Sequence, residues 1–185
     1  KESISAARDF NEIQSKSNTV FKENADVINK WSATAATAFG QSRAQALDNA
    51  SAFGNMFTQL KFTNAESTQM SITMTQLASD FASFHNADIT DVLLAQQAAF
   101  RGEYDSLQRF LPTINAAAVE TEALAETGKK NAKALTDQEK AAAVYQLMLK
   151  GAGDATGDFQ RTSDSLSNQQ RILSAQWEDL QVKIG

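Results

Sequence analysis

The stretch TNAESTQMSITMTQLASDFASF, residues 63–84, carries the clearest helix signal in the sequence. Thr63 and Glu66 have the spacing of a capping box, in which each side chain hydrogen-bonds the other residue's backbone at the start of a helix. Apolar residues then recur every three or four positions, which describes one face of an α-helix. They are Met70, Met74, Leu77, Phe81 and Phe84. We predict an internal helix that packs into the core through this stripe, although its methionines would also suit an adaptable docking face.

Helical patterns extend through the rest of the chain. Two further capping boxes begin at Ser42 and Thr136, and only one proline and eight glycines interrupt the 185 residues. We therefore predict an all-α fold with a compact multi-helix region over residues 42–155. Long amphipathic helices flank this region, one within residues 1–41 and one that begins in residues 156–185 after a linker. Because the chain starts on Lys1 and stops within a helical pattern, we expect a fragment of a longer protein.

The N-terminal segment has a weak helical rhythm from about residue 3 to residue 37. Its apolar positions are Phe10, Ile13, Val20, Val27 and Trp31. Polar Ser17 and Asn24 fall between them, where polar residues lower stability and can fix register. The pattern predicts one marginal helix that needs a neighbour, with a self-associating coiled coil as the alternative.

The C-terminal segment ends in a second apolar stripe. Leu166, Leu173, Trp177, Leu180 and Ile184 follow one another at steps of seven, four, three and four. We expect this face to pack against the helix bundle or against sister copies of the chain. Gln169 and Gln170 lie near the stripe and would weaken a coiled coil at its start. Aspartate at Leu173 or Trp177 is predicted to disrupt oligomers or folding.

Composition excludes several classes of function. The formal net charge is −5 without a cluster of Lys or Arg, which argues against a nucleic-acid platform that neutralises phosphates. The chain has no cysteine, so disulfide and thiol chemistry are excluded. No apolar run approaches the roughly 18 residues of a membrane span. We predict no membrane-spanning segment.

Three features resemble catalytic or binding sites on first inspection. His85 has no second histidine or cysteine with which to hold a metal. The glycine-rich stretch 151–157 has Thr156 where the dinucleotide fingerprint needs its third glycine. It also lacks the preceding strand of that site and the Gly-Lys-Ser/Thr of a P-loop. Glu120, Glu122 and Glu126 lie in an alanine-rich helix and indicate a solvated face rather than a glycosidase pair. We expect no enzyme, no catalytic residue, no cofactor and no metal site.

Four stretches in this order resemble the helical region of tail tape measure proteins of long-tailed phages and prophages. They are LASDFASFHN (77–86), FRGEYDSLQRF (100–110), ALTDQEK (134–140) and GDFQRTSDSLSN (157–168). The corresponding family patterns run roughly LA-DLASF-N, RGE-EPLRRFG, LTEQEKA and GDFARTSDSLANQ. The chain departs from the family at Tyr104-Asp105, where Glu-Pro is usual, and at Leu111-Pro112, where glycine is usual. The resemblance covers about residues 53–185 and is most specific in the last stretch.

The resemblance implies a structural role in the virion. Tape measure proteins lie in the lumen of the tail after assembly in the host cytoplasm, set the tail length and leave ahead of the genome. The implied partners are other copies of the chain, tail tube and tail tip proteins, and tail assembly chaperones. Two alternatives stay open, namely a non-viral helical adaptor or coiled-coil interaction protein, and a non-catalytic part of a cell-wall hydrolase.

Overall fold

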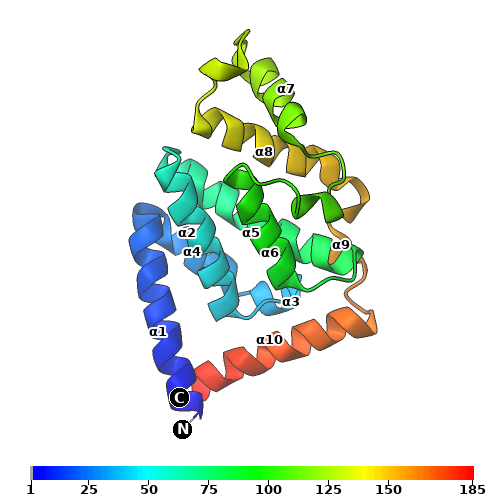
Figure 1. Ribbon diagram of the computed structural model, residues 1–185. Coiled ribbons are helices and arrows are strands. Elements are labelled where there is room, and N and C mark those ends of the chain that lie inside the picture. The colour runs from blue at the N-terminus through cyan, green and yellow to red at the C-terminus, as the bar shows by residue number, and fades with distance from the viewer. Residues whose placement is uncertain (1) are drawn as a thin grey trace.

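In the computed structural model, which describes residues 2–185, every regular element is a helix, and the predicted all-α fold is confirmed (Figure 1). The α-helices are α1 (Glu2–Phe21), α2 (Ala25–Ser32), α3 (Ala35–Phe39), α4 (Arg43–Gln59), α5 (Asn64–Phe84), α6 (Ile89–Phe100), α7 (Ala116–Thr127), α8 (Asp137–Ala152), α9 (Asp158–Arg161) and α10 (Leu166–Ile184). Short 3-10 helices lie between them: η1 (Lys22–Asn24), η2 (Leu107–Arg109), η3 (Ala132–Ala134) and η4 (Gly153–Ala155).

Three of these helices begin at the predicted capping boxes, which are confirmed. At the start of α5, the backbone N–H of Glu66 donates to Thr63 Oγ1 at 3.2 Å, and the N–H of Thr63 donates to Glu66 Oε2 at 2.8 Å. Reciprocal bonds of the same kind start α4 at Ser42 and α8 at Thr136. Each box satisfies backbone donors that the first turn of a helix leaves without partners.

The N-terminal segment is not the single helix that its rhythm predicts. Lys22 has φ +49°, and the chain breaks there and again at Ala33 and Thr34 to give α1, α2 and α3. The break allows both Phe21 of α1 and Ile28 of α2 to be fully buried in one cluster, whereas Val27 of the predicted stripe is half exposed. Burial of two large side chains outweighs the helical continuity of a weak pattern.

The largest apolar core lies among α4, α5, α6, α7 and α8. Its centre is aromatic, with Phe57 edge-on to Phe100 at a centroid distance of 4.8 Å and stacked on Phe53 at 5.9 Å. The hairpin of α7 and α8 forms one end of the molecule, and α10 crosses the opposite end (Figure 1). The molecule therefore has two distant ends joined by the α4–α6 core.

The long terminal helices belong to the body of the protein. A second apolar cluster joins Phe10 and Phe21 of α1, Leu47 of α4 and Ile72 of α5, with Val182 of α10 packed against it. The segments expected at residues 1–41, 42–155 and 156–185 thus share a core. α10 ends beside the start of α1, so both chain ends lie at one corner (Figure 1).

Candidate docking face and its polar junction

The predicted apolar stripe of α10 lies at the surface of the protein. Its residues are Leu166, Leu173, Trp177, Leu180 and Ile184, and their exposed fractions are 78, 62, 60, 44 and 67%. We call these five residues the α10 face. The expectation that the stripe packs against the helix bundle is wrong, and contact with sister copies stays a prediction. A row of large apolar side chains in water marks a candidate interaction surface.

The opposite side of α10 attaches the helix to the bundle through both apolar and polar side chains, and Ile172 and Val182 pack against apolar clusters there. Asn168 and Ala175 are its buried residues. Asp179 accepts a 2.7 Å hydrogen bond from the backbone N–H of Arg43, the first residue of α4. A carboxylate at the N-terminus of a helix offsets the positive end of the helix dipole and satisfies a free donor. Because α10 is attached through this side, its apolar stripe points outward.

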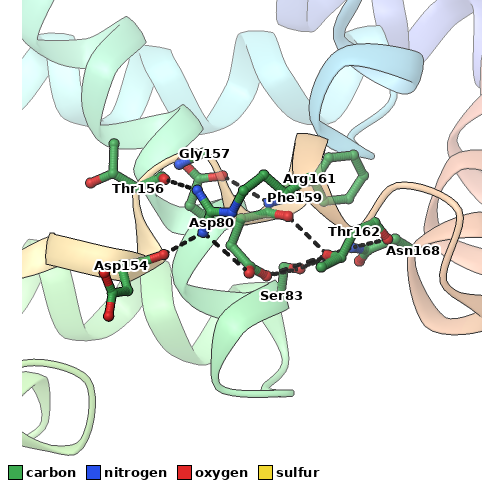
Figure 2. A network of polar contacts seen from close by, with 10 residues as sticks. Asp80, Ser83, Asp154, Thr156, Gly157, Phe159, Arg161, Thr162 and Asn168 are labelled. Atoms are coloured by element: carbon green, nitrogen blue, oxygen red, sulfur yellow. Dashed lines mark hydrogen bonds and ion pairs between the residues drawn. The ribbon is translucent and has the colours of Figure 1, made fainter.

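A network of polar side chains fixes the start of α10 to the C-terminal end of α5 (Figure 2). Ser83 Oγ donates to Asp158 Oδ2 at 2.6 Å and accepts from Asn168 Nδ2 at 2.8 Å. Asn168 Nδ2 also lies 2.9 Å from Thr162 Oγ1. Asp158 and Asn168 are buried, so these bonds compensate for the loss of water. The network determines the direction in which α10 leaves the bundle.

Asp80 anchors the loop before this network. Its carboxylate accepts hydrogen bonds from the backbone N–H groups of Gly157 at 2.9 Å and Phe159 at 3.1 Å (Figure 2). Burial raises the pKa of Asp80, an effect that the two N–H groups oppose and the charge of Asp158 reinforces. The end of the glycine-rich stretch 151–157 therefore presents a backbone donor to a carboxylate of the same chain, whereas a phosphate loop presents its donors to a ligand.

Arg171 makes a second link between α10 and the end of α5. Its Nη2 donates to the carbonyl oxygens of Ala82 at 3.3 Å and Ala87 at 3.0 Å, and its Nη1 donates to Asn168 Oδ1 at 2.7 Å. A guanidinium beside the last carbonyls of a helix complements the negative end of the helix dipole. We call the residues of these contacts the polar junction. They are Asp80, Ser83, Asp158, Thr162, Asn168 and Arg171.

Sequence reasoning did not identify the polar junction. Asp80 and Ser83 lie in the stretch 77–86, and the other members lie at or just after the stretch 157–168. Both stretches carry the family resemblance, which was the one signal that pointed to them. Their meeting in space depends on the path of α6, α7 and α8 between them, and no local pattern indicates it.

The predicted core stripe of α5 is buried along most of its length. Met70, Met74, Leu77 and Phe81 are at most 8% exposed. Phe84 is 48% exposed, and its assignment to the core is wrong. Phe84 is the last residue of α5, where the chain turns away at His85 and Asn86 (φ +49°). The last large side chain of α5 in the core is that of Phe81, one turn earlier, whose ring stacks on that of Phe110 at a centroid distance of 6.4 Å.

The other candidate side chains have structural surroundings. The His85 ring lies against the rings of Phe84 at 5.1 Å and Phe110 at 5.5 Å. Glu122 pairs with Lys150 of α8. Burial, followed by the charge of Glu122, raises the pKa of Glu126. Among residues 2–185 no three His, Cys, Asp or Glu side chains come together as a metal-binding group would.

A hollow of about 660 Å³ opens between α4, α6, α7 and α8. Its lining mixes apolar side chains with Arg101, Tyr104, Glu120 and Lys140. Burial, and then the charge of Glu120, raises the pKa of Tyr104. The charges on this lining are of both signs, with Arg101 and Lys140 positive and Glu120 and Asp137 negative. Within residues 2–185, no helix has the length and apolar character required to cross a bilayer.

Comparison with protein-family models, with curated protein sequences and with solved structures found no match for this chain. The α10 face and the polar junction beneath it are therefore interpreted from their own geometry. An apolar helix face held outward by a buried polar network is suited to bind another helix, because two such faces exclude water from each other.

Proposed function

We propose that this chain is a structural, non-catalytic segment of a phage tail tape measure protein. Its roles are tail assembly, determination of tail length and passage out of the virion with the genome. The observation that supports an assembly role is the orientation of α10, which holds the bundle through one side while its apolar stripe meets solvent. Covering such a face with another helix removes apolar area from water and favours association.

The viral part of the proposal is supported by the resemblance. Two of its four stretches, 77–86 and 157–168, meet at the polar junction, where Asp80 binds the backbone of the later stretch. These contacts give a structural explanation for the polar residues of both stretches that form the junction. The proposed partners are other copies of this chain, tail tube and tail tip proteins, and tail assembly chaperones. The proposed location is the lumen of the virion tail.

The bundle acts in this proposal as a folded docking element. Residues 66–127 double back as α5, α6 and α7, whereas the same residues in one straight helix would span roughly 90 Å, at about 1.5 Å each. Both chain ends also lie at one corner of the bundle (Figure 1). A folded segment of this shape adds little length along a rod and offers a surface to neighbouring proteins.

The test is tail morphology by electron microscopy in a phage whose gene lacks residues 66–127 in frame. We expect absent or misassembled tails, because the deletion removes most of the main apolar core and takes Asp80 and Ser83 out of the polar junction. Tails shortened by roughly 90 Å, at about 1.5 Å per residue, would support the tape measure role but make the segment an extended rod. Normal tails of unchanged length would overturn the proposal.

One further observation separates this proposal from the helical adaptor, and a second tests the expected absence of catalysis. Genes for tail tube, chaperone and tip proteins beside this one support the viral role, and a neighbourhood without them favours a helical adaptor. The purified chain should release no peptidoglycan fragments in a cell-wall hydrolysis assay. Measurable release would contradict a purely structural role.

A further inference from the structure

We infer that the α10 face pairs with α10 of a second copy of this chain, in parallel and in register. The inference rests on the proposed assembly function and names the partner of the surface described above. The five residues of the face occupy the two apolar positions of a heptad repeat, conventionally called a and d. Leu166, Leu173 and Leu180 are at d, and Trp177 and Ile184 are at a. The remaining a position is occupied by Gln170.

The residues that flank the face favour an identical partner. The positions beside a and d, called e and g, carry the charges that select partners in most coiled coils. In α10 they are Ser167, Gln169, Ser174, Gln176, Gln181 and Lys183. Only Lys183 is charged, so two copies of α10 approach each other with little repulsion. No row of one charge is present that would demand a partner of opposite charge.

Three of the four charged residues of α10 are held on the far side of the helix. Arg171 binds the carbonyl groups of Ala82 and Ala87, at and just after the end of α5, and Asp179 binds the backbone of Arg43. Glu178 accepts a 3.2 Å hydrogen bond from Gln45 Nε2. α10 therefore cannot rotate its apolar side inward without breaking these bonds. The face is presented in a fixed orientation, which lowers the entropic cost of pairing.

Gln170 determines the direction of pairing. In a parallel, in-register pair each a residue faces its own counterpart, so the two Gln170 amides can hydrogen-bond each other. In an antiparallel pair each a residue faces a d residue, and all three d residues are leucine. Gln170 would then be buried against a leucine without a hydrogen-bond partner, which is unfavourable. The parallel arrangement avoids this penalty.

The surroundings of α10 leave room for the partner. α10 forms the lower edge of the molecule in Figure 1, and the bundle lies on its other side. A second α10 can lie along this edge with its own bundle pointing away. The pair then has the two α10 helices at its centre and one bundle on each side.

The first experiment measures the mass of the purified 185-residue chain in solution. We expect at least two chains per particle for the unaltered protein and a single chain for Leu173→Asp. The matched control is Leu94→Asp on α6, because Leu94 is exposed to a similar extent, at 57% against 62%. This control should keep the oligomer, and both variants should keep the helical circular dichroism of the parent. A monomeric parent, or equal loss of oligomer in both variants, would overturn the pairing.

The second experiment tests direction by cross-linking. The chain has no cysteine, so Leu180→Cys introduces its only thiol and leaves Gln170 in place. A parallel, in-register pair brings the two Cys side chains together, and mild oxidation should yield a disulfide-linked dimer. Gln69→Cys, on an exposed position of α5, should stay uncrosslinked. An oligomer that fails to cross-link through position 180 would overturn the parallel register.

Failure of the pairing and failure of the proposed function are distinguishable. A monomeric chain with an altered tail phenotype in the deletion phage means that the α10 face has another partner in the tail. A paired chain with normal tails in the deletion phage means that the pairing serves a function outside tail assembly.

Discussion

The carboxylate of Asp80, in the last third of α5, accepts a 2.9 Å hydrogen bond from the backbone N–H of Gly157, 77 positions later in the chain. A second bond from the N–H of Phe159 makes the contact bidentate. Through this contact α5 holds the segment that leads into α10. This contact therefore contributes to the orientation of the α10 face, together with the bonds that α10 itself makes.

Replacing Asp80 by alanine should destabilise the protein by about 1–3 kcal/mol, because two backbone donors in a partly buried place lose their acceptor. Equilibrium unfolding in urea measures this loss. Asp105→Ala, at an exposed carboxylate, serves as the control and should have little effect. Equal stability of the parent and Asp80→Ala would show that the contact does not contribute to folding.

The stabilising effect of Asp80 should depend on pH in a defined direction. Its pKa is raised in the folded protein, so the folded state binds more protons than the unfolded state between the two pKa values. The free energy of unfolding then falls as pH rises through that window, which begins at about 3.9. Glu66 and Glu139 have lowered pKa values and act in the opposite sense. Their contributions cancel when the parent is compared with Asp80→Ala.

The measurement for this pH effect is urea unfolding of both proteins from about pH 4 to neutrality. The stability advantage of the parent over Asp80→Ala should shrink with rising pH. An advantage that is constant or grows over this range would contradict a raised pKa for Asp80.

Gly54 should not tolerate alanine, although it lies inside a helix. A Cβ atom at Gly54 would lie 2.7 Å from Cε1 of the fully buried Phe21. Alanine gains about 1 kcal/mol of helix propensity over glycine, whereas overpacking a core costs about 1–3 kcal/mol. We expect net destabilisation, measured by thermal or urea unfolding. Phe21→Leu in the same chain should relieve part of it, and additive losses in the double variant would argue against this contact.

Phe81 and Phe84 should differ sharply when each is replaced by alanine. Phe81 is 1% exposed and packs in the main core, so its loss should cost about 3–5 kcal/mol. Phe84 lies half in solvent, and its loss should change the unfolding free energy by about 0.5 kcal/mol or less. Parallel urea titrations measure both. Comparable losses of unfolding free energy in the two variants would mean that Phe84 contributes to the core after all.

Local structure followed from the sequence wherever the interacting groups are neighbours in the chain. The capping boxes at Ser42, Thr63 and Thr136 join residues three positions apart, so their spacing alone predicts the start of α4, α5 and α8. The core positions of α5 before Phe84 follow from helical periodicity for the same reason. The all-α class rests on such local preferences, repeated along the chain.

Only the tertiary structure decided how the helices combine. The break at Lys22 depends on the burial of Phe21 and Ile28, which compete with a weak local helix signal. The side on which α10 packs depends on hydrogen bonds to α4 and α5, among them the bond of Asp179 to Arg43. A sequence stripe indicates which side of a helix is apolar. Whether that side meets the core or the solvent depends on partners far away in the chain. In α10 the opposite side makes these contacts, through hydrogen bonds and through Val182.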